Sequence, residues 1–289
     1  MNLFEGLEKF GFSGKKEFDI TKDDKDKEKE KKKLAEKEAA KKQEPDEKSY
    51  ILDRSEKCPV CDKEFTTKQV KSGKVRRKGQ DEDLRPRSIG VDTLKYDVTV
   101  CPYCGYASLN KSFEHVSVTQ IRLLKEQVAS KFKPGEIKNS EIYTYDEAME
   151  RYKLALVSAM VKRAKTSEKS YICLKMAWML RDIVKAMPSE TPEQKKLKSK
   201  KNEEYLGYYN QAFEGFLKAI SEEMPPYFGL QTSTLEFILV NMAVFFKKYD
   251  IASKLLSNLL GSPSTPPRLK DKAIDLKQEI VDAIKNQKN

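Results

Sequence analysis

Four of the five cysteines form two short pairs, Cys58-Pro-Val-Cys61 and Cys101-Pro-Tyr-Cys104. Such pairs are typical of zinc knuckles, in which two thiolates leave one tight turn and the residue after the second cysteine often has a positive φ. Gly105 suits this position, and Asp62 is tolerable there because Asp enters the left-handed region more readily than most residues. The pattern predicts one structural metal site whose ligands are Cys58, Cys61, Cys101 and Cys104.

Zinc is the expected metal, because four thiolates in a tetrahedral arrangement are a usual structural zinc site. Iron in a rubredoxin-like site uses the same ligands and stays open as the alternative. A closed four-thiolate site leaves no position for water or substrate, so it supports the fold and does not catalyse. The two pairs are separated by 39 residues, more than the roughly 15 to 20 of a minimal ribbon, so an inserted hairpin or loop must lie between them.

Other residues with useful chemistry give no catalytic pattern. His115 is the only histidine, and no spacing brings a nucleophile to it, so it is assigned no function. Cys173 lies in an apolar helical stretch and is expected to be an ordinary buried thiol. Asp81 and Asp83 resemble a paired-carboxylate site, but ion pairing inside the same segment is the favoured interpretation. Without a phosphate loop, dinucleotide fingerprint or metal-binding helix motif, the protein is predicted not to be an enzyme, although a carboxylate-based activity in its helical part stays open.

Composition divides the 289-residue chain into four parts. Residues 1–14 form a short apolar peptide, with Leu3, Leu7 and Phe10 at helical spacing, which is either a tail or a helix that docks on a partner or on this protein's own helices. Residues 15–48 carry 13 Lys and 12 Asp or Glu and are predicted to be a solvated linker. Short β-like runs occupy residues 49–118, and a helical period occupies residues 119–289.

The β-like runs predict strands at 65–70 and 94–101, with Ser72-Gly73 as a turn between the first run and Lys74-Val-Arg76. The predicted fold class is α+β, mostly α, with a small zinc-ribbon β module followed by an all-α tetratricopeptide-like helical domain. Breaks between its helices are expected at four proline-containing points, Lys133-Pro-Gly, Met187-Pro-Ser, Met224-Pro-Pro and Gly261-Ser-Pro.

Three helical segments begin at Tyr145, Tyr209 and Tyr249 and share one pattern. In each, Ala follows the tyrosine after three positions, and an aromatic or aliphatic residue follows that Ala after four. This spacing is typical of the second helix of tetratricopeptide repeats, in which Ala lets the two helices approach closely. An irregular helical bundle stays open as the alternative. The polar run from Glu190 to Glu204 is expected to be an insertion between two helices. A terminal helix that caps the stack is predicted to bury Leu269, Ala273, Leu276, Ile280 and Ile284.

The residues around the cysteines form a longer pattern. Phe65 follows Cys58-Pro-Val-Cys61, then comes Asp81-x-Asp83-Leu84, and then Lys95-Tyr-Asp-Val-Thr-Val-Cys-Pro-Tyr-Cys-Gly-Tyr-Ala107 with Phe113. This series resembles the bacterial domain-of-unknown-function 2225 family, closely over residues 50 to 118 and loosely over the helical remainder. The resemblance implies an intracellular bacterial protein with a zinc-ribbon-like N-terminal half and repeat-like helices, and it implies no activity.

Helical-repeat stacks present a groove that commonly holds a peptide or helix of another protein. The favoured function is therefore a non-catalytic binding or adaptor protein with a protein or peptide partner, and residues 1–14 are a candidate intramolecular ligand within reach of the linker. The alternative is a nucleic-acid-associated regulator, because six basic residues and no acid lie in one segment. Its phosphate-binding residues would be Lys68, Lys71, Lys74, Arg76, Arg77 and Lys78.

No membrane insertion is expected, since the longest apolar run, Phe237 to Phe246, has ten residues and a membrane-spanning helix needs roughly 20. Residues 1–14 lack the basic start, apolar block and small-residue cleavage site of a secretory signal. The expected location is therefore the cytoplasm, where thiols stay reduced. The sequence gives no indication of the oligomeric state.

Overall fold

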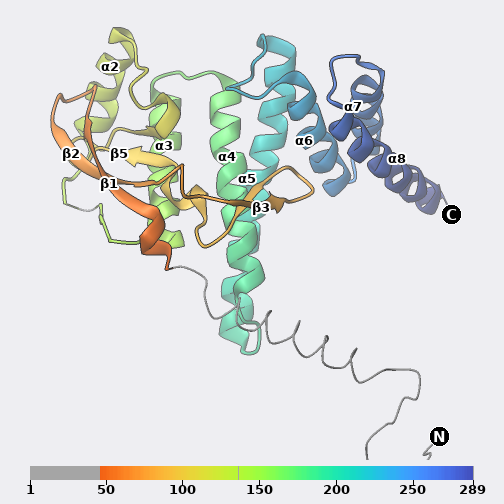
Figure 1. Cartoon of the computed structure of the whole chain (residues 1–289), viewed down its shortest axis with the longest axis horizontal. Helices are drawn as coiled ribbons and strands as arrows, with labels where there is room; N and C mark the ends of the chain where they lie inside the picture. The colour runs from red at the N-terminus through yellow and green to blue at the C-terminus, as the bar shows by residue number, and fades with distance from the viewer. Residues whose placement is uncertain (1–45, 136, 289) are drawn as a thin grey trace, which may run out of the picture. The chain divides into compact units, whose positions relative to one another are not determined.

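The structure is a computed structural model that describes residues 46–135 and 137–288. Residues from Glu47 onward form one compact unit. This unit is α+β with most of its described residues in helices, which confirms the predicted fold class (Figure 1). The predicted N-terminal peptide, and the predicted linker up to residue 45, lie outside the described residues. The short 3₁₀ helix η2 (Glu47–Tyr50) opens the folded unit, so the last residues of the predicted linker belong to it.

The β part consists of three two-stranded antiparallel hairpins in the described residues. The first cysteine pair lies in the turn of the first hairpin, and the second pair lies in the turn of the third. The second hairpin lies between them in the chain, which confirms the predicted insertion. The strand pairs are β1 (Ile51–Lys57) with β2 (Glu64–Val70), β3 (Arg77–Gln80) with β4 (Pro86–Ser88), and β5 (Val98–Val100) with β6 (Ala107–Leu109).

The predicted strand at 94–101 is wrong in part, whereas the strand at 65–70 and the turn at Ser72-Gly73 are confirmed. The predicted strand 94–101 begins instead with the 3₁₀ helix η3 (Thr93–Tyr96), because the Asp92 carboxylate accepts a hydrogen bond from the Leu94 amide and caps it, so that only β5 is extended. A turn does follow β2, where the Lys74 amide donates to the Lys71 carbonyl at 2.9 Å. However, β2 pairs with β1 and not with 74–76, since the first cysteine turn joins β1 to β2.

All four predicted breaks separate helical elements, and further breaks occur at 162–165 and 246–248. Within the described residues, no helix is both long and apolar enough to cross a membrane. The helical elements are α2 (Val118–Leu124), the π-helical turn η5 (Lys125–Ala129), α3 (Tyr145–Val161), α4 (Thr166–Ala186), α5 (Pro192–Glu222), α6 (Thr232–Phe245), α7 (Tyr249–Gly261) and α8 (Pro267–Lys288).

The polar run from Glu190 to Glu204 is not an insertion between helices, because it begins helix α5. The Thr191 side chain accepts a hydrogen bond from the Gln194 amide, and Pro192 occupies the first turn. Both features favour a helix start. The Lys and Glu residues that follow have high helix propensity, so the helix continues directly into the apolar segment that begins at Tyr205.

Consecutive helices from α3 to α8 pack against one another, and Figure 1 shows them in chain order. One buried cluster includes side chains of β5, β6 and these helices, so the strands share a core with the helical part. The three predicted repeat segments lie on α3, α5 and α7, with their Ala residues buried. The boundary at residue 118 and the tetratricopeptide assignment stay predictions. Among the predicted residues of the terminal helix, the cluster includes Leu269, Ala273, Leu276 and Ile280.

Candidate metal centre and a charged groove

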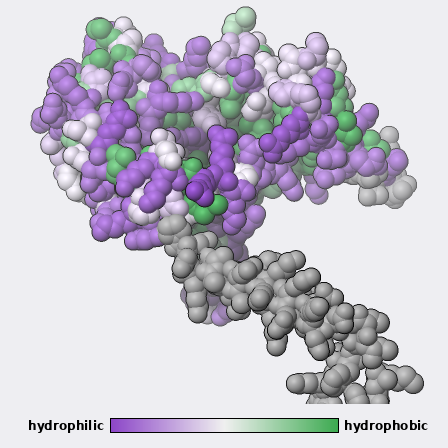
Figure 2. Space-filling view, in the orientation of Figure 1, coloured by the Kyte–Doolittle hydropathy of each residue, from purple (hydrophilic) through white to green (hydrophobic). Residues whose placement is uncertain are grey.

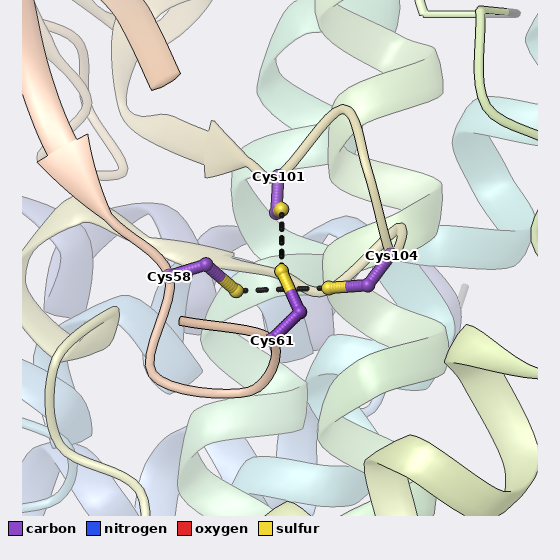
Figure 3. Close-up of side chains that lie close together, drawn as sticks. All are labelled: Cys58, Cys61, Cys101 and Cys104. Carbon is purple, nitrogen blue, oxygen red and sulfur yellow. Dashed lines mark hydrogen bonds between the residues drawn. The ribbon is translucent and has the colours of Figure 1, made fainter. Parts of the chain in front are cut away.

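The four predicted ligands meet where the turns of two hairpins face each other (Figure 3). The Sγ atoms of Cys58 and Cys104 are 3.6 Å apart, as are those of Cys61 and Cys101, and all four lie within 4.8 Å of one another. A tetrahedral site with Zn–S bonds of about 2.3 Å separates its sulfurs by about 3.8 Å, whereas a disulfide needs about 2.05 Å. The cluster therefore has the dimensions of a metal site, and all its cysteines are free.

The two cysteine turns have the same backbone geometry. The Cys58 amide donates to the Lys63 carbonyl at 3.0 Å, as the Cys101 amide donates to the Tyr106 carbonyl at 2.8 Å. In the first turn the Val60 amide also points at the Cys58 sulfur, at 3.4 Å. Amides directed at the sulfurs stabilise thiolates, and this geometry is the one expected of a knuckle.

The electrostatics of the cluster favour a cation at its centre. The pKa of Cys101 is lowered, because the thiols of Cys104 and Cys58 donate hydrogen bonds to its sulfur. The pKa of Cys104 is raised, because its thiol uses its proton in hydrogen bonds to Cys101 and Cys58. Burial of the Cys104 side chain raises this pKa further. Four thiolates cannot stay ionised so close together without a positive charge, which a bound divalent metal ion supplies.

Apolar side chains enclose the cysteine cluster and connect it to the helices. Phe65 and Phe113 make an edge-to-face contact with ring centroids 6.0 Å apart, and Tyr106 stacks on Phe113 at 5.0 Å. Leu124 of α2 and Val128 of η5 complete the same buried cluster. A metal ion bound by these four cysteines would connect two hairpins, next to the buried side chains of α2 and η5.

The structure also places the other residues that the sequence singled out, which are Cys173, His115, Asp81 and Asp83. Cys173 is buried in α4, as predicted, and burial raises the pKa of its thiol to about 11. His115 is exposed beyond the second cysteine turn. Asp81 and Asp83 form ion pairs, as predicted, but these reach beyond their own segment to Arg181 of α4.

The six basic residues between 68 and 78 do not form one continuous charged surface. Lys68 pairs with Asp53 at 2.7 Å. The ammonium groups of Lys71 and Lys74 donate to the Ser49 carbonyl, both at 3.2 Å. The other three basic side chains are exposed and have no polar partner in the described residues, and they are Arg76, Arg77 and Lys78.

The loop between β3 and β4 is fixed to α4 by arginine–carboxylate pairs. Arg87 donates two hydrogen bonds to the Asp81 carboxylate, of 2.8 and 2.6 Å. Arg181 of α4 donates to Asp83 at 2.6 Å and to Asp81 at 2.8 Å. The Trp178 indole donates to Asp83 at 2.7 Å. Bidentate pairs of this kind hold their partners in one geometry, so the loop is anchored to the helix.

A fully buried arginine extends this network. Arg85 contacts Asp92 at 2.9 Å and Asp182 at 2.8 Å, and Asp182 also pairs with Arg87. Burial acts to raise the pKa of Asp182, but the hydrogen bond of Arg87 and the charges of the arginines outweigh it, so this pKa is below its usual value. The same balance lowers the pKa of Asp81. These carboxylates are therefore ionised counter-ions at neutral pH.

A groove of about 630 Å³ lies beside this network. Its lining combines residues of the β3–β4 loop and Arg181 with aromatic and aliphatic residues of α5, α6 and α8. It borders a second hollow of about 160 Å³ that shares four of its lining residues. On the face shown in Figure 2, hydrophobic residues gather over the C-terminal helices, while hydrophilic residues cover most of β1 and β2. The apolar lining residues are Tyr205, Tyr209, Val244, Phe245 and Leu276.

Two tyrosines of α5 give the groove an unusual polar feature. Tyr205 and Tyr209 are 7% and 3% exposed, and both line the groove. Neither hydroxyl has a hydrogen-bond partner in the described part of the chain, and neither oxygen is among its buried polar atoms that lack a partner, so both hydroxyls reach the groove although their rings are buried. Burial raises the pKa of Tyr209, so its hydroxyl remains a donor at neutral pH. Both hydroxyls are therefore available to a bound molecule.

The groove was not predicted from the sequence. Its wall depends on Trp178, Arg181 and Asp182, and the one available signal was a charged pair directly after an apolar run in α4, Met176 to Leu180. Two opposite charges, Arg181 and Asp182, directly after this run indicate that they pair with residues of another helix or strand. The sequence does not show which residues those are. The partners are the acids and arginines of the β3–β4 loop, nearly a hundred residues earlier in the chain.

The model of one protein family, DUF2225, described as an uncharacterized protein conserved in bacteria, matches residues 51–280. This match covers both cysteine turns, the β3–β4 loop and the helices up to most of α8. The chain has no significant match among curated proteins or among solved structures. Because the family model spans most of its length, the chain belongs to the bacterial DUF2225 family.

Proposed function

We propose that this protein is a non-catalytic binding or adaptor protein of the cytoplasm, in which a structural zinc site fixes the hairpins and the groove holds a short apolar segment of a partner protein. The observation that carries the proposal is the pair of buried tyrosines that line the groove with unpartnered hydroxyls. Such hydroxyls can donate to the backbone carbonyls of a bound segment. Phe245, which is 46% exposed, offers apolar surface beside them.

The charges around the groove favour a segment that carries a basic residue. Glu82 and Glu279 line it and have no ion-pair partner in the described part of the chain. Asp275 lines the smaller hollow and is likewise unpaired there. Arg87 and Arg181 are paired with carboxylates, and Lys185 is the third basic residue of the lining. The lining therefore has four acids (Asp81, Glu82, Asp83 and Glu279) against three basic residues, an excess of one negative charge that favours a basic side chain in the partner.

The acids of the groove support a binding role over an acid–base reaction. A general acid or base works best when its pKa is near the operating pH. The pKa of Asp81 is instead lowered, and Asp83 is held by Arg181 and the Trp178 indole. Asp81 is therefore ionised at neutral pH, and the Asp83 carboxylate is occupied by its two hydrogen-bond donors.

Selection of phage-displayed random 12-residue peptides tests the proposal. The bait is the full chain and, in parallel, a variant that lacks residues 2–14, a deletion that leaves the compact unit from Glu47 intact. We expect selected peptides to combine aromatic or aliphatic residues with Lys or Arg. Their affinity should fall about fivefold in Tyr209→Phe, which removes one hydrogen bond worth about 1 kcal/mol.

Tyr208→Phe is the matched control, because Tyr208 lies on the same helix and does not line the groove. Tyr209→Phe keeps the ring contacts with Phe245 and Phe246, so folding should be unaffected. Peptides that bind equally well to wild type, Tyr209→Phe and a Glu82→Lys/Glu279→Lys variant would contradict the proposed function. So would the failure of both baits to select any peptide.

A further inference from the structure

We propose that residues 192–204, which begin α5, form a basic arm that binds the phosphates of double-stranded nucleic acid. None of these residues lines the groove, so the inference is independent of the proposed function. It assigns a second kind of partner, which the protein would bind at a separate place.

The basic arm contributes no buried side chain to the core. Within α5, every buried residue lies at Tyr205 or beyond it. At 1.5 Å per residue, residues 192–204 span about 20 Å. Figure 1 shows this end of α5 extending beyond the other helices and the hairpins. Core packing therefore does not account for this part of the helix.

The middle of the basic arm carries a run of lysines without any acid, which are Lys195, Lys196, Lys198, Lys200 and Lys201. Side chains three or four positions apart are neighbours on a helix, and like charges at these spacings repel. Lys196 and Lys200 are four positions apart, and Lys198 is three positions from both Lys195 and Lys201. A helix that needed only solubility is better served by alternating signs. The run is therefore unfavourable for the helix itself, which favours an anionic partner.

Most of this positive charge has no counter-ion in the described residues. The ammonium groups of Lys195, Lys196 and Lys200 have no polar partner there. Lys198 donates to the Met187 carbonyl at 3.0 Å, but this acceptor is neutral and leaves the charge uncompensated.

The acids of the basic arm lie at its two ends. Glu193 is in the first turn, and Glu203 and Glu204 are at the other end. Glu204 pairs with Lys153 of α3 at 3.0 Å and contacts Lys201 at 3.4 Å. The positive charge is therefore concentrated in the middle of the arm.

The lysines lie on two sides of the helix. At about 100° per residue, Lys196 and Lys200 share one side, and the other three lysines are centred about 180° away. Phosphate strands border both sides of the major groove of a duplex, which is about 12 Å wide and admits an α-helix. A bilayer or a flat acidic protein surface offers negative charge on one side only. The two rows of lysines therefore favour a duplex as the partner.

Fluorescence anisotropy with a labelled 20-base-pair DNA duplex and the full chain tests the inference. The variant Lys195→Gln/Lys196→Gln/Lys200→Gln removes the three unpartnered charges and keeps residues of high helix propensity. Each phosphate contact contributes about 0.9 to the slope of log affinity against log salt, so the slope should fall by about 2.7. Between 50 and 200 mM salt, the affinity of the wild type should then fall about 40-fold more than that of the variant.

Two control variants accompany this measurement. Arg at the same three positions keeps the charge and should keep the wild-type slope. The variant Lys125→Gln/Lys131→Gln/Lys133→Gln removes the same charge from exposed residues that follow α2, which Figure 1 shows well apart from the arm. Its slope should change much less. An equal change of slope in both Gln variants, or loss of binding in the Arg variant, would overturn the inference.

The two rows of lysines are tested separately. Lys196→Gln/Lys200→Gln and Lys195→Gln/Lys198→Gln should each lower the slope by about 1.8, because a duplex contacts both sides of the arm. A change in only one of the two variants would indicate a flat partner and contradict the proposal.

Vesicles of equal parts phosphatidylcholine and phosphatidylglycerol distinguish a membrane from a duplex. They should not discriminate between the wild type and the triple Gln variant. If the triple Gln variant lost binding to the vesicles and not to the duplex, the partner of the arm would be an anionic membrane and the proposed duplex would be wrong.

Discussion

Asp62 and Gly105 occupy the same position in the two cysteine turns, each directly after the second cysteine, with φ angles of 61° and 72°. Their amides donate to the carbonyls of Cys58 and Cys101 at 2.9 and 3.0 Å. Both positions require a left-handed backbone conformation, but the side chains around them differ. Asp62 is exposed, whereas a Cβ on Gly105 would lie 2.3 Å from the Phe132 ring. The second turn thus requires glycine for both its positive φ and its closeness to Phe132, whereas the first turn has only the positive φ, which Asp62 tolerates.

Gly105→Ala should destabilise the protein by about 2 to 4 kcal/mol, because it adds left-handed backbone strain to an overlap with Phe132. Thermal unfolding followed by circular dichroism measures the effect. Asp62→Gly is the matched control and should be neutral or slightly stabilising, since it relieves strain at an exposed position. Equal stability of Gly105→Ala and wild type would show that Phe132 does not lie over this turn.

Cys104→Ser should lose the metal and lower the thermal midpoint, because three thiolates hold zinc far less tightly than four. Elemental analysis of the purified protein should give one equivalent of zinc in the wild type and distinguishes zinc from iron. Cys173→Ala is the control, since Cys173 is a buried thiol outside the cluster. It should keep the full metal content. A wild-type protein purified without any metal would contradict the proposed structural site.

Arg87→Met should cost about 2 kcal/mol at pH 7, less than a fully buried pair, because Arg87 and Asp81 are partly exposed. The pKa of Asp81 and Asp182 is lowered in the folded protein, so their ionised forms stabilise the fold above the unfolded pKa, and this contribution is lost as pH falls through the folded pKa. Without Arg87 both pKa values rise, because only the charges of Arg85 and Arg181 then oppose the effect of burial.

The difference in unfolding free energy between wild type and Arg87→Met should therefore be larger at pH 7 than at pH 4. Urea titration followed by the fluorescence of Trp178, the only tryptophan, measures it at both values. Arg122→Met removes an exposed pair with Glu126 and should change little at either pH. A difference that does not depend on pH would mean that the two carboxylates do not depend on Arg87.

The sequence predicted the cysteine cluster and the helix breaks because both depend on local spacing. Two cysteines in one turn must lie close together, and a proline breaks a helix unless it stands in the first turn. The strand at 94–101 failed because the side chain of Asp92 caps a helical turn, and the fate of the run after Glu190 depended on the cap at Thr191.

The groove could not be predicted, because its wall joins residues far apart in the chain. Asp83 pairs with Arg181, and Arg87 pairs with Asp182, across more than ninety residues. A single sequence shows which residues are charged but not which of them meet. That the hydroxyls of Tyr205 and Tyr209 reach a groove could not be predicted either, since the same aromatic spacing fits a closed core.

The alternative function makes a separate prediction about Arg76, Arg77 and Lys78, the three basic residues of their segment whose side chains have no polar partner in the described residues. If they contact phosphates, the triple Ala variant should reduce the slope of log affinity against log salt by about 2.7, since each contact contributes about 0.9. Fluorescence anisotropy with a labelled 20-base-pair duplex at several salt concentrations measures the slope.

The triple variant Lys68→Ala, Lys71→Ala and Lys74→Ala is the matched control for charge. Those ammonium groups are engaged by Asp53 and by the Ser49 carbonyl, so their removal should alter the slope much less. An equal loss of slope in both variants would indicate a diffuse attraction that does not depend on which lysines or arginines are exposed. A wild-type protein that does not bind the duplex at 50 mM salt would exclude phosphate binding by this segment, because electrostatic binding is strongest at low salt.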